Sequence, residues 1–167
     1  MLFKPLSLVF LAASALADTG ILSSAKLFQN DIAAMTRQVD GWQGGIIGAV
    51  PLAGSYFTTL SHAYEGLDVA KAASPLSAAD TSSLLAISTD ISDLVDKAMN
   101  TVIAAKSKTG SIPGLPFFLR LNLGIQRQLV NDFCNLVLLK IPTDAQPDFK
   151  ALIAKNDASF ARAINSY

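Results

Sequence analysis

Along most of the chain, hydrophobic residues recur every three or four positions, which is the period of amphipathic α-helices. Between Ile21 and Val39 the apolar positions step by four, three, four, three and four residues. The same pattern continues downstream, so that five helices are predicted, over residues 21–39, 55–73, 77–105, 117–141 and 149–167. The alternation that is typical of strands is not seen. The chain is therefore predicted to be all-α, a single-domain five-helix bundle.

The segment Phe117–Ile141 is more apolar than one buried face requires, since fifteen of its twenty-five residues are hydrophobic. They form two neighbouring stripes, one of Phe118, Leu121, Ile125, Leu129 and Leu136, the other of Leu119, Leu123, Val130, Cys134 and Val137, with Phe133 between them. Arg120, Arg127 and Asp132 interrupt the run, and a charge near a bilayer centre costs about 2.5–3.5 kcal/mol, which argues against a transmembrane segment. We predict the central helix of the bundle, whose excess apolar surface faces either packed helices or a lipid-like ligand.

The first seventeen residues have the features of a secretory signal peptide. Lys4 precedes an apolar core, and Ala15-Leu16-Ala17 is a small-x-small cleavage signal before Asp18. We therefore expect a secreted, extracellular protein with one helical domain over residues 18–167. This mature chain has twelve basic and thirteen acidic residues, a net charge of minus one, which indicates no attraction to nucleic acid or anionic lipid.

Two stretches rich in glycine and proline, Asp40–Gly54 and Gly110–Pro116, are predicted to be apolar loops. The glycines fit neither nucleotide-binding fingerprint. The first loop carries four apolar residues, which we expect to be exposed as a contact patch or lid: Trp42, Ile46, Ile47 and Val50.

Residues suited to catalysis are scarce, so the sequence predicts a protein that is not an enzyme. His62 is the only histidine, and no G-x-S-x-G elbow is present. The single cysteine, Cys134, lies on an apolar stripe, which favours a buried thiol. Asp90, Asp93 and Asp96 supply too few converging oxygens for a hard cation, and Lys97 is spaced to pair with Asp93, so neither a metal nor a cofactor is predicted.

If the bundle is hollow, a hydrophobic ligand would lie against the central helix and its neighbours. The expected apolar lining consists of Phe118, Leu121, Ile125, Leu129, Phe133, Leu94, Ala98 and Leu60. Asn122, Gln126 and Asp132 fall inside the apolar sector, and together with Arg127 they are candidates to contact a ligand head group. The alternatives are that the first three bond to neighbouring helices or cap loops, and that Arg127 is a solvated surface residue.

Three stretches carry a family resemblance: LFQNDIAAMTRQVDGWQGG, SPLSAADTSSLLAISTDISDLVDKAMNTVIAAK and LVNDFCNLVLLKIP. They resemble the hydrophobic surface-binding protein A family, which includes fungal cell-wall galactomannoproteins. The resemblance implies a secreted helical domain that adsorbs to hydrophobic surfaces, and some related domains hold fatty acids inside the bundle. Cell-wall members have a Ser/Thr-rich stalk or an anchor tail, and this chain ends at Tyr167 without either, so a freely secreted form is expected.

The favoured function is a non-enzymatic protein that binds hydrophobic surfaces or carries a long-chain fatty acid. A secreted effector or structural bundle that acts through a protein partner is the alternative. Whether the core is filled or hollow is left open by the sequence.

Overall fold

The computed structural model describes the backbone of residues 4–110 and 112–167, and the side chains of residues 20–110 and 112–167. These parts of the chain contain helices and no strand, so the predicted all-α class is confirmed. Six helices are described, rather than the five predicted: α1 (Lys4–Gly41), α2 (Ile46–Ala72), α3 (Ala78–Ala104), α4 (Lys106–Thr109), α5 (Leu115–Leu138) and α6 (Gln146–Ser166). The additional helix is α4, a single turn between the end of the third predicted helix at residue 105 and the predicted loop Gly110–Pro116.

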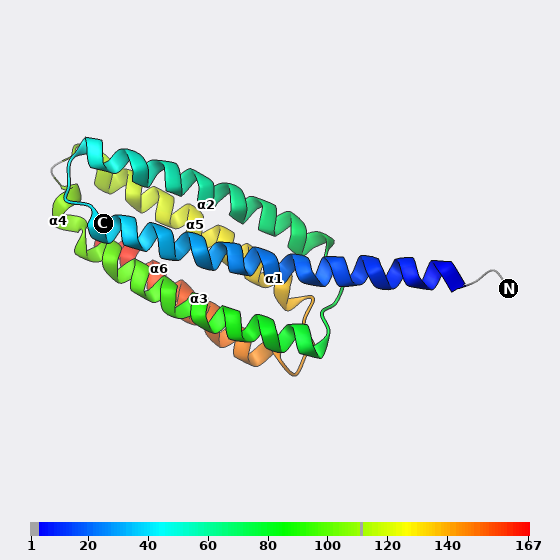
Figure 1. The fold of residues 1–167 in the computed structure, drawn as a ribbon. Coiled ribbons are helices and arrows are strands. Elements are labelled where there is room, and N and C mark those ends of the chain that lie inside the picture. Colours follow the sequence, from blue (N-terminus) through cyan, green and yellow to red (C-terminus); the bar gives the residue numbers. More distant parts are fainter. Residues whose placement is uncertain (1–3, 111) are drawn as a thin grey trace.

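The five long helices pack side by side as a closed ring in the order α1, α2, α5, α6, α3 and back to α1. Helices α1, α3 and α6 run in one direction, and α2 and α5 in the other (Figure 1). One end of the bundle, the loop end, holds residues 42–45, 105–110 and 112–114. The opposite end, the far end, holds residues 73–77 and 139–145. No long helix lies at the centre of this ring.

The prediction that α5 is a central helix is therefore wrong, because α5 is one wall of the ring. Its second stripe faces the interior, where Leu123, Val130 and Val137 are buried. Its first stripe turns outward near the loop end, where Leu121 is 54% and Ile125 is 37% exposed. Hydrophobicity on most sides of α5 thus reflects an exposed apolar surface in addition to a buried one.

Helix α2 begins at Ile46 rather than Ser55, so most of the predicted loop Asp40–Gly54 is helical. Gly44 and Gly45 adopt φ angles of 96° and 83°, which favour glycine and confine the turn to a few residues. Pro51 is accommodated inside the helix. Low helix propensity is overridden here because Ala49, Leu52 and Ala53 point toward the interior.

Helix α1 was predicted over residues 21–39 and extends from Lys4 to Gly41. Its first part projects beyond the bundle (Figure 1). Residues 1–3 of the expected signal peptide lie outside the described residues, as do the side chains of residues 4–17, and cleavage before Asp18 stays a prediction. None of the helices described combines the length and the hydrophobicity that crossing a membrane requires.

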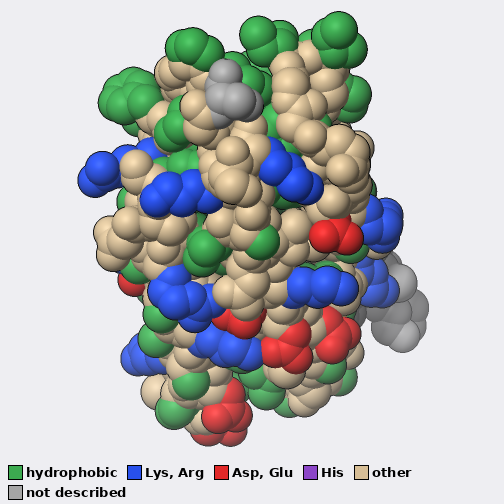
Figure 2. Space-filling model, turned by 90° about the vertical axis from the view of Figure 1, so that its left-hand side faces the viewer, with side chains coloured by type: hydrophobic (Ala, Val, Ile, Leu, Met, Phe, Trp, Pro, Cys, Tyr) green, Lys and Arg blue, Asp and Glu red, His purple; other side chains and the backbone are tan. Residues whose placement is uncertain are grey.

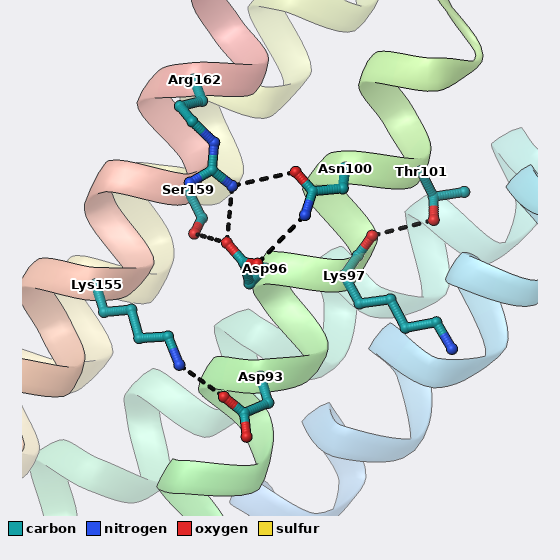
Figure 3. A network of polar contacts seen from close by, with 8 residues as sticks. All are labelled: Asp93, Asp96, Lys97, Asn100, Thr101, Lys155, Ser159 and Arg162. Atoms are coloured by element: carbon teal, nitrogen blue, oxygen red, sulfur yellow. Dashed lines mark hydrogen bonds and ion pairs between the residues drawn. The ribbon is translucent and has the colours of Figure 1, made fainter.

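The acidic row of α3 joins that helix to α6 (Figure 3). Lys155 Nζ lies 2.6 Å from Asp93 Oδ1, and Arg162 Nη2 lies 2.7 Å from Asp96 Oδ1. The predicted pairing of Asp93 with Lys97 is wrong, since Lys97 extends away from Asp93 in Figure 3. These carboxylates therefore help to close the ring.

Candidate functional site

The ring of helices surrounds an apolar pocket of about 240 Å3 in the half nearest the loop end. All five long helices contribute to its wall. Its bulky lining residues include Phe28, Ile32 and Met35 of α1, Leu52 and Tyr56 of α2, Val95 and Met99 of α3, Leu119 and Leu123 of α5, and Phe160 of α6. A water molecule needs about 10–15 Å3 of such space and two to four polar partners, so these walls favour an apolar guest over water.

Half of the predicted apolar lining faces this pocket, namely Phe118, Leu129, Ala98 and Leu60. Phe133 lines a second pocket deeper in the bundle, and Leu94 packs against the core. Leu121 and Ile125 lie on the outer surface, which corrects their assignment as lining. The error follows from placing α5 at the centre.

Two of the four candidate head-group residues, Asn122 and Gln126, line the pocket one helical turn apart. Asn122 is only 8% exposed, and its Nδ2 donates to Phe118 O at 2.7 Å. The hydroxyls of Thr36, Thr59 and Thr109 each donate to a carbonyl of their own helix. The amides on α5 thus retain more capacity for a ligand than these threonines do.

Sequence reasoning missed Tyr56 as a polar candidate. Tyr56 lines the pocket, and burial, with a smaller contribution from Tyr64, raises the pKa of its hydroxyl. The phenol is therefore a neutral hydrogen-bond donor, like the two amides. Its place on the apolar stripe of α2 concealed this role.

The other two candidates, Arg127 and Asp132, lie outside the pocket. Arg127 donates hydrogen bonds to both carboxylate oxygens of Asp157 on α6. Asn131 Nδ2 also donates to Asp157 Oδ1, at 3.0 Å. Asp132 is exposed. The narrow polar strip of α5 is thus the seam between α5 and α6, and this pairing occupies the guanidinium that could otherwise have contacted a carboxylate.

Trp42 was expected in an exposed patch and is instead buried, with 6% of its surface accessible. Its indole Nε1 donates to Gly45 O at 3.3 Å, and its backbone oxygen accepts from Lys108 Nζ at 2.6 Å. The ring fits because Gly48 has no side chain, since a Cβ there would lie 2.9 Å from Trp42 Cδ1. Trp42 thus closes the pocket at the loop end, whereas Ile46, Ile47 and Val50 are exposed as expected.

A second pocket, of about 70 Å3, lies deeper along the axis of the ring. Four residues line both pockets and separate them: Phe28, Ala63, Leu129 and Val130. Cys134 and His62 both line this deeper space, and His62 Nδ1 lies 2.7 Å from Asp31 Oδ2. Burial raises the pKa of the Cys134 thiol to about 12, so the thiol stays protonated and is a poor nucleophile.

Comparisons with known proteins agree with this architecture. The chain is similar in fold to AFMP4P in complex with palmitic acid, with a TM-score of 0.85 and 19% identity over 89% of this chain and 98% of that one. It is also similar to ligand binding domain 1 of the Penicillium marneffei MP1 protein complexed with arachidonic acids, with a TM-score of 0.83 and 18% identity over 89% and 97% of the two chains. Ligand binding domain 2 of the same protein, in complex with arachidonic acids, gives a TM-score of 0.81 and 17% identity over 89% and 92%.

The sequence itself identifies the family. No curated protein matches the chain. A family model described as hydrophobic surface binding protein A matches residues 22–138, from the first ring helix to the end of α5. Because this match spans more than half of the sequence, the chain belongs to the hydrophobic surface binding protein A family.

Proposed function

We propose that the protein carries one long-chain fatty acid, or a similar single-chain lipid, in the apolar pocket between its five long helices. The observation that supports this most directly is the closed ring of helices around a pocket with almost wholly apolar walls. Solved structures with the same fold hold palmitic or arachidonic acid, which agrees with the proposal. The Cys134 thiol is protonated and therefore a poor nucleophile, which agrees with a binding role rather than a catalytic one.

Affinity would come from burying the acyl chain. Each methylene transferred from water contributes about 0.8 kcal/mol, and ordering of the chain offsets part of that gain. The neutral donors Asn122, Gln126 and Tyr56 would orient the head group without the cost of burying an unpaired cation. Arg127 would have no direct part, because it is paired with Asp157.

Leu129 offers a test, because it lines both pockets and lies between them. Leu129→Trp should abolish uptake of a fluorescent fatty acid by delipidated protein while the fold is retained. Leu139→Trp is the matched control, because Leu139 is 76% exposed at the far end. This variant should take up the fluorescent fatty acid like the wild type. If Leu129→Trp mainly lowers the melting temperature and wild-type protein takes up no fatty acid, the core is filled and the carrier proposal fails.

The head-group assignment has its own test. Asn122→Leu should weaken binding of a fatty acid several-fold and leave binding of its methyl ester nearly unchanged, because fewer donors remain for the carboxyl group. Arg127→Gln should change neither affinity by more than about twofold. Equal losses for acid and ester in Asn122→Leu would show that the amide only shapes the pocket.

Adsorption to hydrophobic surfaces is a second candidate function, favoured by the exposure of Ile46, Ile47 and Val50. Replacing Ile46 and Ile47 with serine should reduce retention on hydrophobic beads while the melting temperature changes little. A large fall in melting temperature would instead make these residues part of the core. We further propose secretion with a mature terminus at Asp18, which terminal sequencing of protein from the culture medium would test.

A further inference from the structure

Helices α2 and α5 both begin at the loop end, and their first turns expose an unusual number of large apolar side chains. We define the apical patch as Ile46, Ile47, Val50, Phe117, Phe118 and Leu121. Ile47 is 91% and Phe117 is 74% exposed. Figure 2 shows hydrophobic side chains gathered along one edge of this end. Exposed apolar clusters of this kind mark interaction sites.

The apical patch is continuous with the pocket. Phe118 lines the pocket and is also 46% exposed. In the same turns, Leu115 and Leu119 of α5 and Ala49 of α2 face the pocket. A single layer formed by residues 46–54 and 115–122 therefore separates the pocket from the surface here.

Local helix stability is low at the α2 side of this layer. Neither α2 nor α5 has a side-chain cap at its first residue. Pro51 has no N–H to donate to the carbonyl of Ile47, and glycines at positions 48 and 54 lower the helix propensity of the same turns. Displacing these turns costs less than displacing the middle of a long helix.

Basic residues lie along one side of the apical patch (Figure 2). Residues 37–50 and 104–121 contain four basic residues, Arg37, Lys106, Lys108 and Arg120, and one acidic residue, Asp40, which is a net charge of plus three. The whole chain is neutral, so the remaining residues carry minus three. Figure 2 shows Lys and Arg side chains in a band beside the hydrophobic edge. Apolar side chains bordered by cations are suited to an anionic lipid–water interface.

We infer that the protein docks through the apical patch on an anionic lipid surface and exchanges its ligand between the first turns of α2 and α5. The exchange step rests on the proposed carrier function, whereas docking does not. The net charge of minus one expected for the mature chain gives no sign of this site, because the positive charge near the loop end is cancelled by the negative charge of the other residues.

The test separates binding from transfer. Affinity is measured with a monomeric fluorescent fatty acid, and transfer is followed as quenching when loaded protein meets phosphatidylcholine vesicles with or without phosphatidylglycerol. The transfer rate of the wild type should rise with vesicle concentration and with phosphatidylglycerol content, and fall with added salt. A transfer rate that is independent of vesicle concentration and charge would mean that the fatty acid first dissociates into water, and would overturn the inference.

Four variants locate the effect. Ile47→Ser with Phe117→Ser should lower the transfer rate at least fivefold and leave affinity unchanged, because neither residue lines the pocket. Lys106→Gln with Arg120→Gln should lower partitioning to anionic vesicles about fivefold per cation at low salt. Leu139→Ser and Lys150→Gln, at the far end, are the matched controls. Equal losses in the controls would overturn the inference.

Two further results distinguish failure of the carrier proposal from failure of the docking inference. If the wild type binds no monomeric fatty acid, the carrier proposal fails. Docking is then judged by co-flotation of the protein with the same vesicles. The variants of the apical patch should no longer float with the vesicles, whereas the control variants should. If Ile47→Ser with Phe117→Ser converts a dimer into monomers and leaves transfer unchanged, the apical patch joins two copies of the chain and the docking inference is overturned.

Discussion

Arg127 Nη2 lies 2.7 Å from Asp157 Oδ2, while Arg127 Nε binds the other oxygen of the same carboxylate. This bidentate ion pair joins α5 to α6, the two helices that lie opposite α1 in the ring. Hydrogen bonds from Arg127 and then Asn131 lower the pKa of Asp157 from its ordinary 3.8 to about 2. The ring is therefore stabilised by a carboxylate that must be ionised.

Acid should weaken the fold through this pair. Since the folded pKa of Asp157 is depressed, its contribution is complete above about pH 4 to 5 and is lost as the pH falls toward 2. Asp157→Asn should lower the free energy of unfolding near pH 6 by at most about 1–2 kcal/mol, because the pair is partly solvated, and the difference should vanish near pH 2. Urea unfolding across this range measures it. Asp132→Asn, at an exposed position on α5, the helix that carries Arg127, should change stability by less than about 0.5 kcal/mol, and a loss equal to that of Asp157→Asn would contradict the assignment.

Gly48 and Gly54 lie in the same helix and should respond oppositely to alanine. A Cβ at Gly48 would lie 2.9 Å from Trp42 Cδ1, whereas one at Gly54 has no neighbour within 4 Å. Gly48→Ala should destabilise the protein by about 1–3 kcal/mol by displacing the indole, and Gly54→Ala should stabilise it by about 0.4–1 kcal/mol. Chemical denaturation with tryptophan fluorescence reports both. Stabilisation by Gly48→Ala would show that Trp42 does not close the pocket as described.

The thiol of Cys134 should be slow to react in the native protein. With its pKa raised to about 12 by burial, roughly one molecule in ten thousand carries a thiolate at pH 8. A thiol reagent should therefore react slowly with folded protein, promptly in denaturant, and faster as the pH rises. Native reactivity equal to that of the unfolded chain would place Cys134 in contact with solvent.

Helical periodicity predicted most of the ring correctly. The apolar stripe from Ile21 to Val39 lies within α1, and α3 begins at Ala78, next to the predicted start at residue 77. Local spacing is sufficient for such features, because each depends on residues only a few positions apart.

The start of α2 could not be predicted in this way. Glycine and proline rules favour a loop over residues 40–54, and the helix forms because Leu52 and its neighbours contact side chains of other helices. The burial of Trp42 has the same origin, since it depends on the missing side chain of Gly48. These features are decided by tertiary packing.

The candidate site was predicted in part for a related reason. Counting apolar residues on α5 shows that two stripes exist, but not that one faces a pocket and the other solvent. Asn122, a candidate to contact a head group, lines the pocket, whereas Leu121, a candidate lining residue, is exposed. Likewise, no spacing rule pairs Arg127 with a residue thirty positions away on α6.

The most direct test of a carrier is calorimetric titration of delipidated protein with saturated fatty acids of increasing chain length, with native mass spectrometry to count the bound molecules. One molecule should bind per chain, and each added methylene should raise affinity by up to about fourfold until the pocket is full, after which the gain stops. Absence of heat, of a mass shift and of any change in melting temperature at every chain length would contradict the carrier function and leave surface adsorption as the role of the exposed apolar residues.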